Sequence, residues 1–149
     1  MAASSWRQIW LCPRQISDGH RQPVTWVSVE SSLPENTLAS GLVTAANAKL
    51  FTPKKPVKGW TYIAHWGPWS ENKDELGIIL FYRAAEAQEM PEENETRPIR
   101  FTSASPQYAF AAVWGKGPQG IDTERKFRQF LNTTLNEVAK SQKIKKLND

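Results

Sequence analysis

The chain has 149 residues, a formal net charge of +4, 40% hydrophobic residues and a single cysteine. This length suits one domain, 1–149, whose core needs no disulfide or metal, and the lone cysteine excludes an intramolecular disulfide. The apolar stretches are far shorter than the ~20 residues that cross a bilayer. We therefore expect no membrane contact and a cytoplasmic location.

The charges are segregated along the chain. Residues 1–60 carry a net charge of +4, residues 61–98 carry −5 and residues 99–149 carry +5. A surface with separate positive and negative regions steers an oriented partner. The alternative is that these charges only solvate loops and helix faces.

The first elements predicted are two strands. Alternating side chains indicate strands at 6–11 and 24–30, which form a hairpin across the turn residues 17–20. The period changes over 34–50, where Leu38, Leu42 and Leu50 recur at helical spacing, so we predict a helix there. Gly41 opposes this helix, because an internal glycine costs about 1 kcal/mol relative to alanine.

Four strands are predicted in the second half of the chain. An aromatic strand spans 60–66, and the almost wholly apolar segment 76–83 is typical of a central strand covered on both faces. The glutamate-rich segment 84–98 lacks apolar periodicity and predicts an exposed, mobile loop. Strands at 99–103 and 108–114 are expected to pair with each other through Ser105 and Pro106.

The last element predicted is a helix that begins at Asp122 or Thr123, either of which can cap it. Phe127, Leu131 and Leu135 contribute to an apolar stripe over about three turns, and a basic tail follows near 140–149. The predicted order is ββαββββα. The fold class is therefore α+β: a single domain with a mostly antiparallel, curved sheet and the C-terminal helix packed on one face.

The most unusual segment is aromatic and follows a basic loop. In a strand, Trp60, Tyr62 and Trp66 share one face, which is either a wall of the core or an exposed stacking platform. On the second interpretation the partner-binding residues are Lys54, Lys55, Lys58, Trp60, Tyr62, Trp66 and Trp69.

Exposed aromatic rings beside positive charge predict a binding module that contacts a protein partner or a second copy of itself. Secondary basic contacts would come from Arg125, Arg128, Lys140, Lys143, Lys145 and Lys146. One alternative is a single-stranded nucleic-acid binding protein, in which bases stack on the rings and cations follow the phosphates. A second alternative is a domain that binds a small apolar ligand.

No motif identifies a catalytic site, and we predict no cofactor and no metal. One cysteine, Cys12, and two histidines, His20 and His65, are too few and too scattered for a zinc site. The sequence leaves an enzymatic role open. A cavity joining His65 to two carboxylates would favour one.

Overall fold

The computed structural model describes the backbone of residues 6–13 and, with their side chains, residues 24–141. The predicted contacts Lys143, Lys145 and Lys146 lie outside these ranges. The elements in chain order are β1 (Trp6–Pro13), β2 (Val24–Ser31), β3 (Ala39–Val43), β4 (Lys49–Phe51), β5 (Trp60–Gly67), β6 (Leu76–Arg83), the 3-10 turn η1 (Ala84–Glu86), β7 (Ala87–Glu89), β8 (Thr96–Phe101), β9 (Gln107–Trp114) and α1 (Glu124–Lys140).

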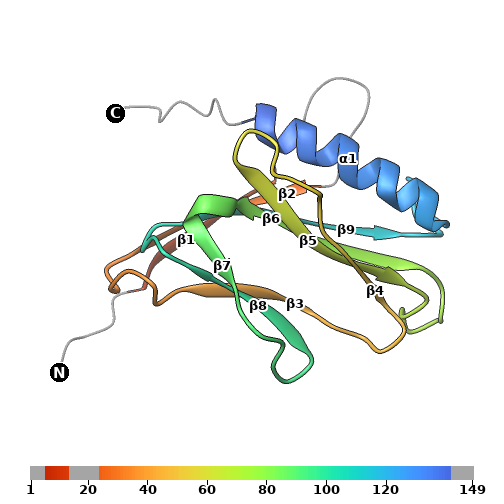
Figure 1. Ribbon diagram of the computed structural model, residues 1–149, viewed down its shortest axis with the longest axis horizontal. Coiled ribbons are helices and arrows are strands. Elements are labelled where there is room, and N and C mark those ends of the chain that lie inside the picture. The colour runs from red at the N-terminus through yellow and green to blue at the C-terminus, as the bar shows by residue number, and fades with distance from the viewer. Residues whose placement is uncertain (1–5, 14–23, 142–149) are drawn as a thin grey trace.

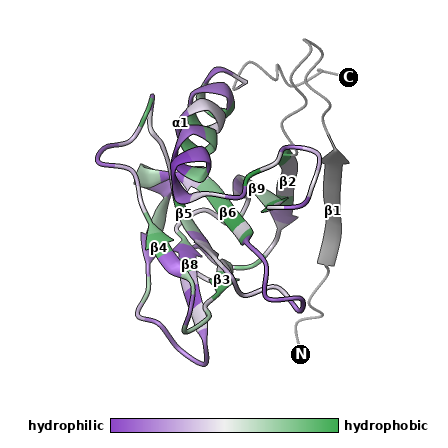
Figure 2. Cartoon of the chain, turned by 90° about the vertical axis from the view of Figure 1, so that its right-hand side faces the viewer, coloured by the Kyte–Doolittle hydropathy of each residue, from purple (hydrophilic) through white to green (hydrophobic). Residues whose placement is uncertain are grey.

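The strands form two antiparallel sheets. The large sheet has the order β1-β2-β9-β6-β5-β4, and the small sheet has the order β3-β8-β7. Helix α1 covers one face of the large sheet, and the small sheet lies against part of the other face (Figure 1). Figure 2 shows α1 on one side of β5, β6 and β9, with β3 and β8 on the other. The predicted α+β fold with a terminal helix on an antiparallel sheet is confirmed.

The helix begins where the sequence predicts. Thr123 is the N-cap and its Oγ1 accepts a hydrogen bond from the backbone N–H of Lys126 at 3.3 Å. The apolar stripe of α1 packs on the sheet through seven buried residues: Phe127, Phe130, Leu131, Thr134, Leu135, Val138 and Ala139. Phe127 sits directly over Gly77, where a Cβ atom would lie only 2.5 Å from the ring carbon Cε2. The helix therefore approaches the sheet closely because β6 has no side chain at this point.

The small sheet builds a second core on the opposite face. Alternation along β5 and β6 sends Ile63 and Leu80 away from the helix, where they pack with Leu42, Ile99 and Phe101 of the small sheet. Strands β3 and β7 have only 5 and 3 residues. A sheet this small cannot cover the whole face of a six-stranded sheet.

The predicted helix over 34–50 is wrong. This segment contains β3 and the start of β4, joined by a turn in which the N–H of Ala48 donates to the carbonyl of Ala45 at 3.0 Å. Gly41 shows the reason, because a Cβ there would lie 2.9 Å from the carbonyl oxygen of Arg97 on β8. The close approach of two strands needs the glycine that a helix disfavours.

The predicted loop over 84–98 is also wrong in part. The segment contains η1, β7 and the start of β8, and β7 pairs with β8 from Ala87 to Glu89. Its side chains are mostly exposed, which removes the apolar pattern that reveals a strand. The expected pairing of 99–103 with 108–114 is wrong as well, because β8 belongs to the small sheet and β9 to the large one.

Other strand predictions are confirmed. β1 and β2 pair antiparallel as expected, although the predicted turn over 17–20 lies outside the described residues; the aromatic segment is β5, and β6 is an interior strand between β9 and β5. These segments have a clear alternation or a continuous apolar run, the two patterns that local sequence reports best.

Candidate functional site

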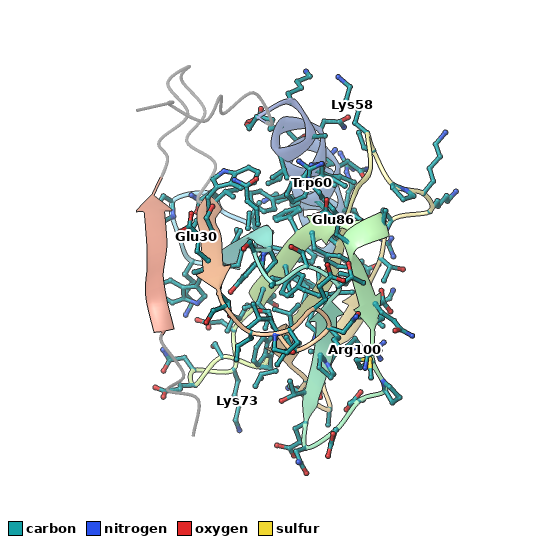
Figure 3. All side chains as sticks on the ribbon, turned by 90° about the vertical axis from the view of Figure 1, so that its left-hand side faces the viewer. Glu30, Lys58, Trp60, Lys73, Glu86 and Arg100 are labelled. Carbon is teal, nitrogen blue, oxygen red and sulfur yellow. The ribbon has the colours of Figure 1, made fainter. Side chains whose placement is uncertain are left out.

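The structure corrects the role predicted for the first two aromatic residues of β5. Trp60 is 0% exposed and Tyr62 is 4% exposed, and both belong to the core under α1. Figure 3 shows Trp60 beneath the helix and Lys58 at the outer margin of the molecule. Burial also raises the pKa of the Tyr62 phenol. Neither ring has a surface to offer a partner, so the aromatic face of this strand is a wall of the core.

The other two tryptophans of this segment are half-buried. The Trp66 ring stacks on Phe127 with 6.1 Å between ring centroids and 22° between planes. The indole N–H of Trp69 donates to the carbonyl of Leu76 at 2.7 Å. Both side chains therefore hold the framework together.

The predicted basic contacts are on the surface but are not gathered around exposed aromatic rings. Lys54, Lys55 and Lys58 are exposed in the loop before β5, and Arg125, Arg128 and Lys140 are exposed on α1. Arg128 donates to Glu124 from Nη2 at 2.8 Å and lies 4.7 Å from the centroid of the Phe51 ring. The Arg128 guanidinium therefore makes its charged contacts within the domain.

Among residues 24–141, the exposed aromatic rings lie on a different strand, β9. Phe110 is 41% exposed and Trp114 is 42% exposed. Positions 110, 112 and 114 share one face of β9, and Ala112 is also exposed. Leu76 pairs with Trp114 and Ile78 pairs with Ala112, so their half-buried side chains lie beside this row. We call Leu76, Ile78, Phe110, Ala112 and Trp114 the β9 strip.

The sequence predicts a strand over 108–114, but its pattern does not indicate a site there. The available signal was the alternation of aromatic and alanine residues, Tyr108-Ala109-Phe110-Ala111, which is ordinary for a strand. Nothing local distinguishes the covered face from the uncovered one. Phe110 and Trp114 are exposed because they face away from α1 and lie outside the cluster packed against the small sheet, which reaches only as far as Ile78 and Tyr108.

Trp114 is fixed in place by a buried carboxylate. Its indole N–H donates to Oδ1 of Asp74 at 2.8 Å, and the hydroxyl of Ser70 donates to the same oxygen. The Lys116 ammonium lies 3.4 Å from the other oxygen, Oδ2. The hydrogen bonds from Ser70 and Trp114, followed by the contact with Lys116, hold the pKa of Asp74 below its ordinary value.

A cavity of about 510 Å³ opens on the same side of the large sheet, between the β3–β4 connection and the β7–β8 turn. It is lined by Thr44, Ala45, Ala46, Ala48, Leu50, His65, Glu92, Glu95 and Arg97. It therefore joins His65 to two carboxylates, a combination that would favour an enzyme. Within residues 24–141, however, the hydrogen-bond partner of the ring is the carbonyl of Val43, and no carboxylate orients it as in a hydrolytic triad.

The described part of the chain supports neither a metal site nor a membrane-spanning helix. No cluster of three His, Cys, Asp or Glu residues there could hold a metal ion. No helix described by the structure is long and apolar enough to cross a membrane.

The antiparallel sheets and the terminal helix that the structure describes define an α+β domain with an open apolar strip and a separate cavity of mixed polar and apolar lining. The chain belongs to the family described as a domain of unknown function (DUF4861), whose model matches residues 14–144. Neither the curated proteins nor the solved structures contain a match to it.

Proposed function

We propose that this domain is a binding module that contacts a protein partner through the β9 strip. The observation that carries the proposal is the exposure of Phe110 and Trp114, 41% and 42%, on one face of an interior strand. Apolar rings that remain exposed on one face of the same strand mark a contact surface more often than isolated ones do.

The fixed geometry of Trp114 supports this proposal. Tryptophan is among the residues that contribute most to protein contacts, and a ring that is already immobile loses little conformational entropy on binding. Asp74 holds the indole N–H at 2.8 Å while a large part of the ring stays exposed. Trp114 is therefore organised before any partner arrives.

The arrangement favours a protein over single-stranded nucleic acid. Trp60 and Tyr62, the rings predicted to stack with bases, are buried. The lysines predicted as contacts, Lys54, Lys55 and Lys58, precede Trp60, which pairs with Arg83 at one end of β6. Trp114 pairs with Leu76 at the other end, where the ammonium of Lys116 already lies against the carboxylate of Asp74. These ends are roughly 20 Å apart at about 3.3 Å per residue, so the basic loop does not adjoin the exposed indole.

Site-specific photo-crosslinking tests the proposal. A photoreactive amino acid replaces Ala112, in the centre of the strip, or Gln129, on the exposed side of α1. In cells that produce the protein, we expect position 112 to give a discrete protein adduct and position 129 to give none. An adduct with a second copy of this chain or with another protein would support the proposal.

The supporting adduct must depend on the two rings. Combining position 112 with Phe110→Ser and Trp114→Ser should abolish it, while circular dichroism shows that the fold is retained. The proposal is rejected by the absence of an adduct at 112, by the same adducts from 112 and 129, or by an adduct that survives loss of both rings.

A further inference from the structure

The cavity between the β3–β4 connection and the β7–β8 turn is independent of the β9 strip. Its volume of about 510 Å³ lies within the range of about 300–1,000 Å³ that is typical of small-molecule sites. One wall is apolar and comes from Ala45, Ala46, Ala48 and Leu50, and the remaining lining is polar. A ligand that fits both parts has an apolar body and a polar head.

His65 presents a hydrogen-bond acceptor to this cavity. Nδ1 lies 3.0 Å from the carbonyl oxygen of Val43, and a carbonyl only accepts, so Nδ1 must carry the proton. In the neutral ring Nε2 is then the acceptor. No described residue forms a hydrogen bond with Nε2, and Nε2 is not among the fully buried side-chain nitrogen and oxygen atoms that lack a partner.

The carboxylates of the cavity differ in how they are neutralised. Thr44 Oγ1 donates to Glu92 Oε1 at 2.9 Å, and Arg97 Nη2 lies 3.8 Å from Glu92 Oε2. Across residues 24–141, by contrast, no cation forms an ion pair with Glu95. The lining thus combines two carboxylates with one guanidinium, and the unpaired negative charge is on Glu95.

Glu95 is held at the cavity by its backbone. Its φ of 56° lies in the left-handed region, which is uncommon for a residue with a side chain. The adjacent Asn94 has a φ of 49°, and the carbonyl of Glu95 accepts a hydrogen bond from the N–H of Thr44 at 2.7 Å. This bond ties the β7–β8 turn to the opposite side of the cavity.

We infer that this cavity binds a small organic amine in its ammonium form. The ammonium group donates to Nε2 of His65 and pairs with the Glu95 carboxylate, while its hydrocarbon part contacts the alanine and leucine wall. An organic carboxylate of the same shape is disfavoured, because it meets an excess of negative charge. An uncharged alcohol keeps a donor but loses the ion pair.

Isothermal titration calorimetry on the full chain with three probes of one shape tests this inference. Cyclohexylmethylamine, cyclohexylmethanol and cyclohexanecarboxylate are compared at one pH and ionic strength. We expect saturable binding of the amine, at least tenfold weaker binding of the alcohol, and none of the carboxylate. Equal or tighter binding of the carboxylate, or no saturable binding of the amine, overturns the inference.

Two glutamates of the same turn provide a matched pair. Glu95→Gln should weaken amine binding by about tenfold, whereas Glu93→Gln, which removes the same charge from a residue outside the cavity lining, should change it less than twofold. Equal effects of the two variants would show that the amine responds only to the general charge of the turn, and the inference would fail.

His65 gives a local readout. The chain has two histidines, so the imidazole resonance of His65 can be assigned by comparison with His65→Asn. We expect the amine to shift this resonance with the same saturation as the calorimetric signal. His65→Asn retains an N–H group for the Val43 carbonyl but removes Nε2, and should weaken binding at least fivefold. An unmoved His65 resonance at saturation overturns the inference even if the amine binds elsewhere.

Discussion

The two faces of the large sheet are built from the same strands but differ in how much of their aromatic surface is buried. On the helix face, Trp60, Phe81 and Phe127 are all 0% exposed. On the other face, Phe110 and Trp114 keep more than two fifths of their surface, at 41% and 42%. An aromatic residue on a strand therefore does not by itself indicate core or contact surface, because the layer above it decides.

The covering layers explain this difference. Helix α1 has 17 residues and packs with a continuous apolar stripe on the large sheet. The small sheet contributes short strands that pack mainly on Ile63, Leu80 and Tyr82. From β2 to β5 the helix face is covered, whereas the other face keeps both the β9 strip and the cavity beside His65.

The largest expected effect is at the centre of the helix face. Phe127 is fully buried against Phe51, Trp66 and Gly77. Phe127→Ala should lower the free energy of unfolding by about 3–5 kcal/mol, as measured by urea denaturation. Phe110→Ala is the counterpart on the open face, and its cost should stay within about 1 kcal/mol. Similar losses for the two variants would refute the difference between the faces.

A smaller effect is expected from adding volume. Gly77→Ala places a methyl group against the Phe127 ring and should destabilise the fold by about 1–3 kcal/mol through overpacking. Ala112→Val adds two methyl groups on the exposed side of β9 and should change the unfolding free energy by less than about 0.5 kcal/mol. The same denaturation experiment compares them. A Gly77→Ala variant as stable as the parent would show that the helix can move away without cost.

The third effect is limited to acid pH. The folded-state pKa of Asp74 is lowered by Ser70, Trp114 and Lys116, so its carboxylate stabilises the fold above the ordinary value of about 3.8. This contribution is lost as the pH falls through the lowered folded value. Thermal melts between pH 2 and 5, about the range where such carboxylates titrate, should show a shallower acid dependence for Asp74→Asn than for the parent.

Glu71→Gln is the control for this pH dependence, since Glu71 is an exposed acid in the same loop. It should retain the acid dependence of the parent. If Asp74→Asn follows the parent curve instead, the carboxylate does not anchor Trp114 through its charge.

The sequence predicted the elements with a strong local pattern. The alternation of β5, the apolar run of β6 and the stripe of α1 each lie within one segment, and each was recognised. The segment 34–50 failed because Leu38, Leu42 and Leu50 have helical spacing, whereas Gly41 serves the contact with β8. That contact joins residues far apart in the chain, so no local pattern reports it.

The candidate sites were harder to predict. The sequence pattern pointed to Trp60 and Tyr62 as binding residues. These aromatic residues are closely spaced in the sequence, but α1 covers the face on which they lie. The strip includes Phe110 and Trp114, which look like ordinary strand residues. The cavity brings together His65 of β5, Thr44 after β3, and Glu92 and Glu95 before β8, and only the packing of two sheets makes them neighbours.

By itself, the sequence determined the α+β class, the place of the terminal helix and which residues alternate across each strand, because backbone period and capping are local properties. Tertiary structure decided which of the two faces is sealed, how the described strands divide between a large and a small sheet and where a cavity remains. Burial depends on which layers meet, and that choice is made between segments distant in the chain.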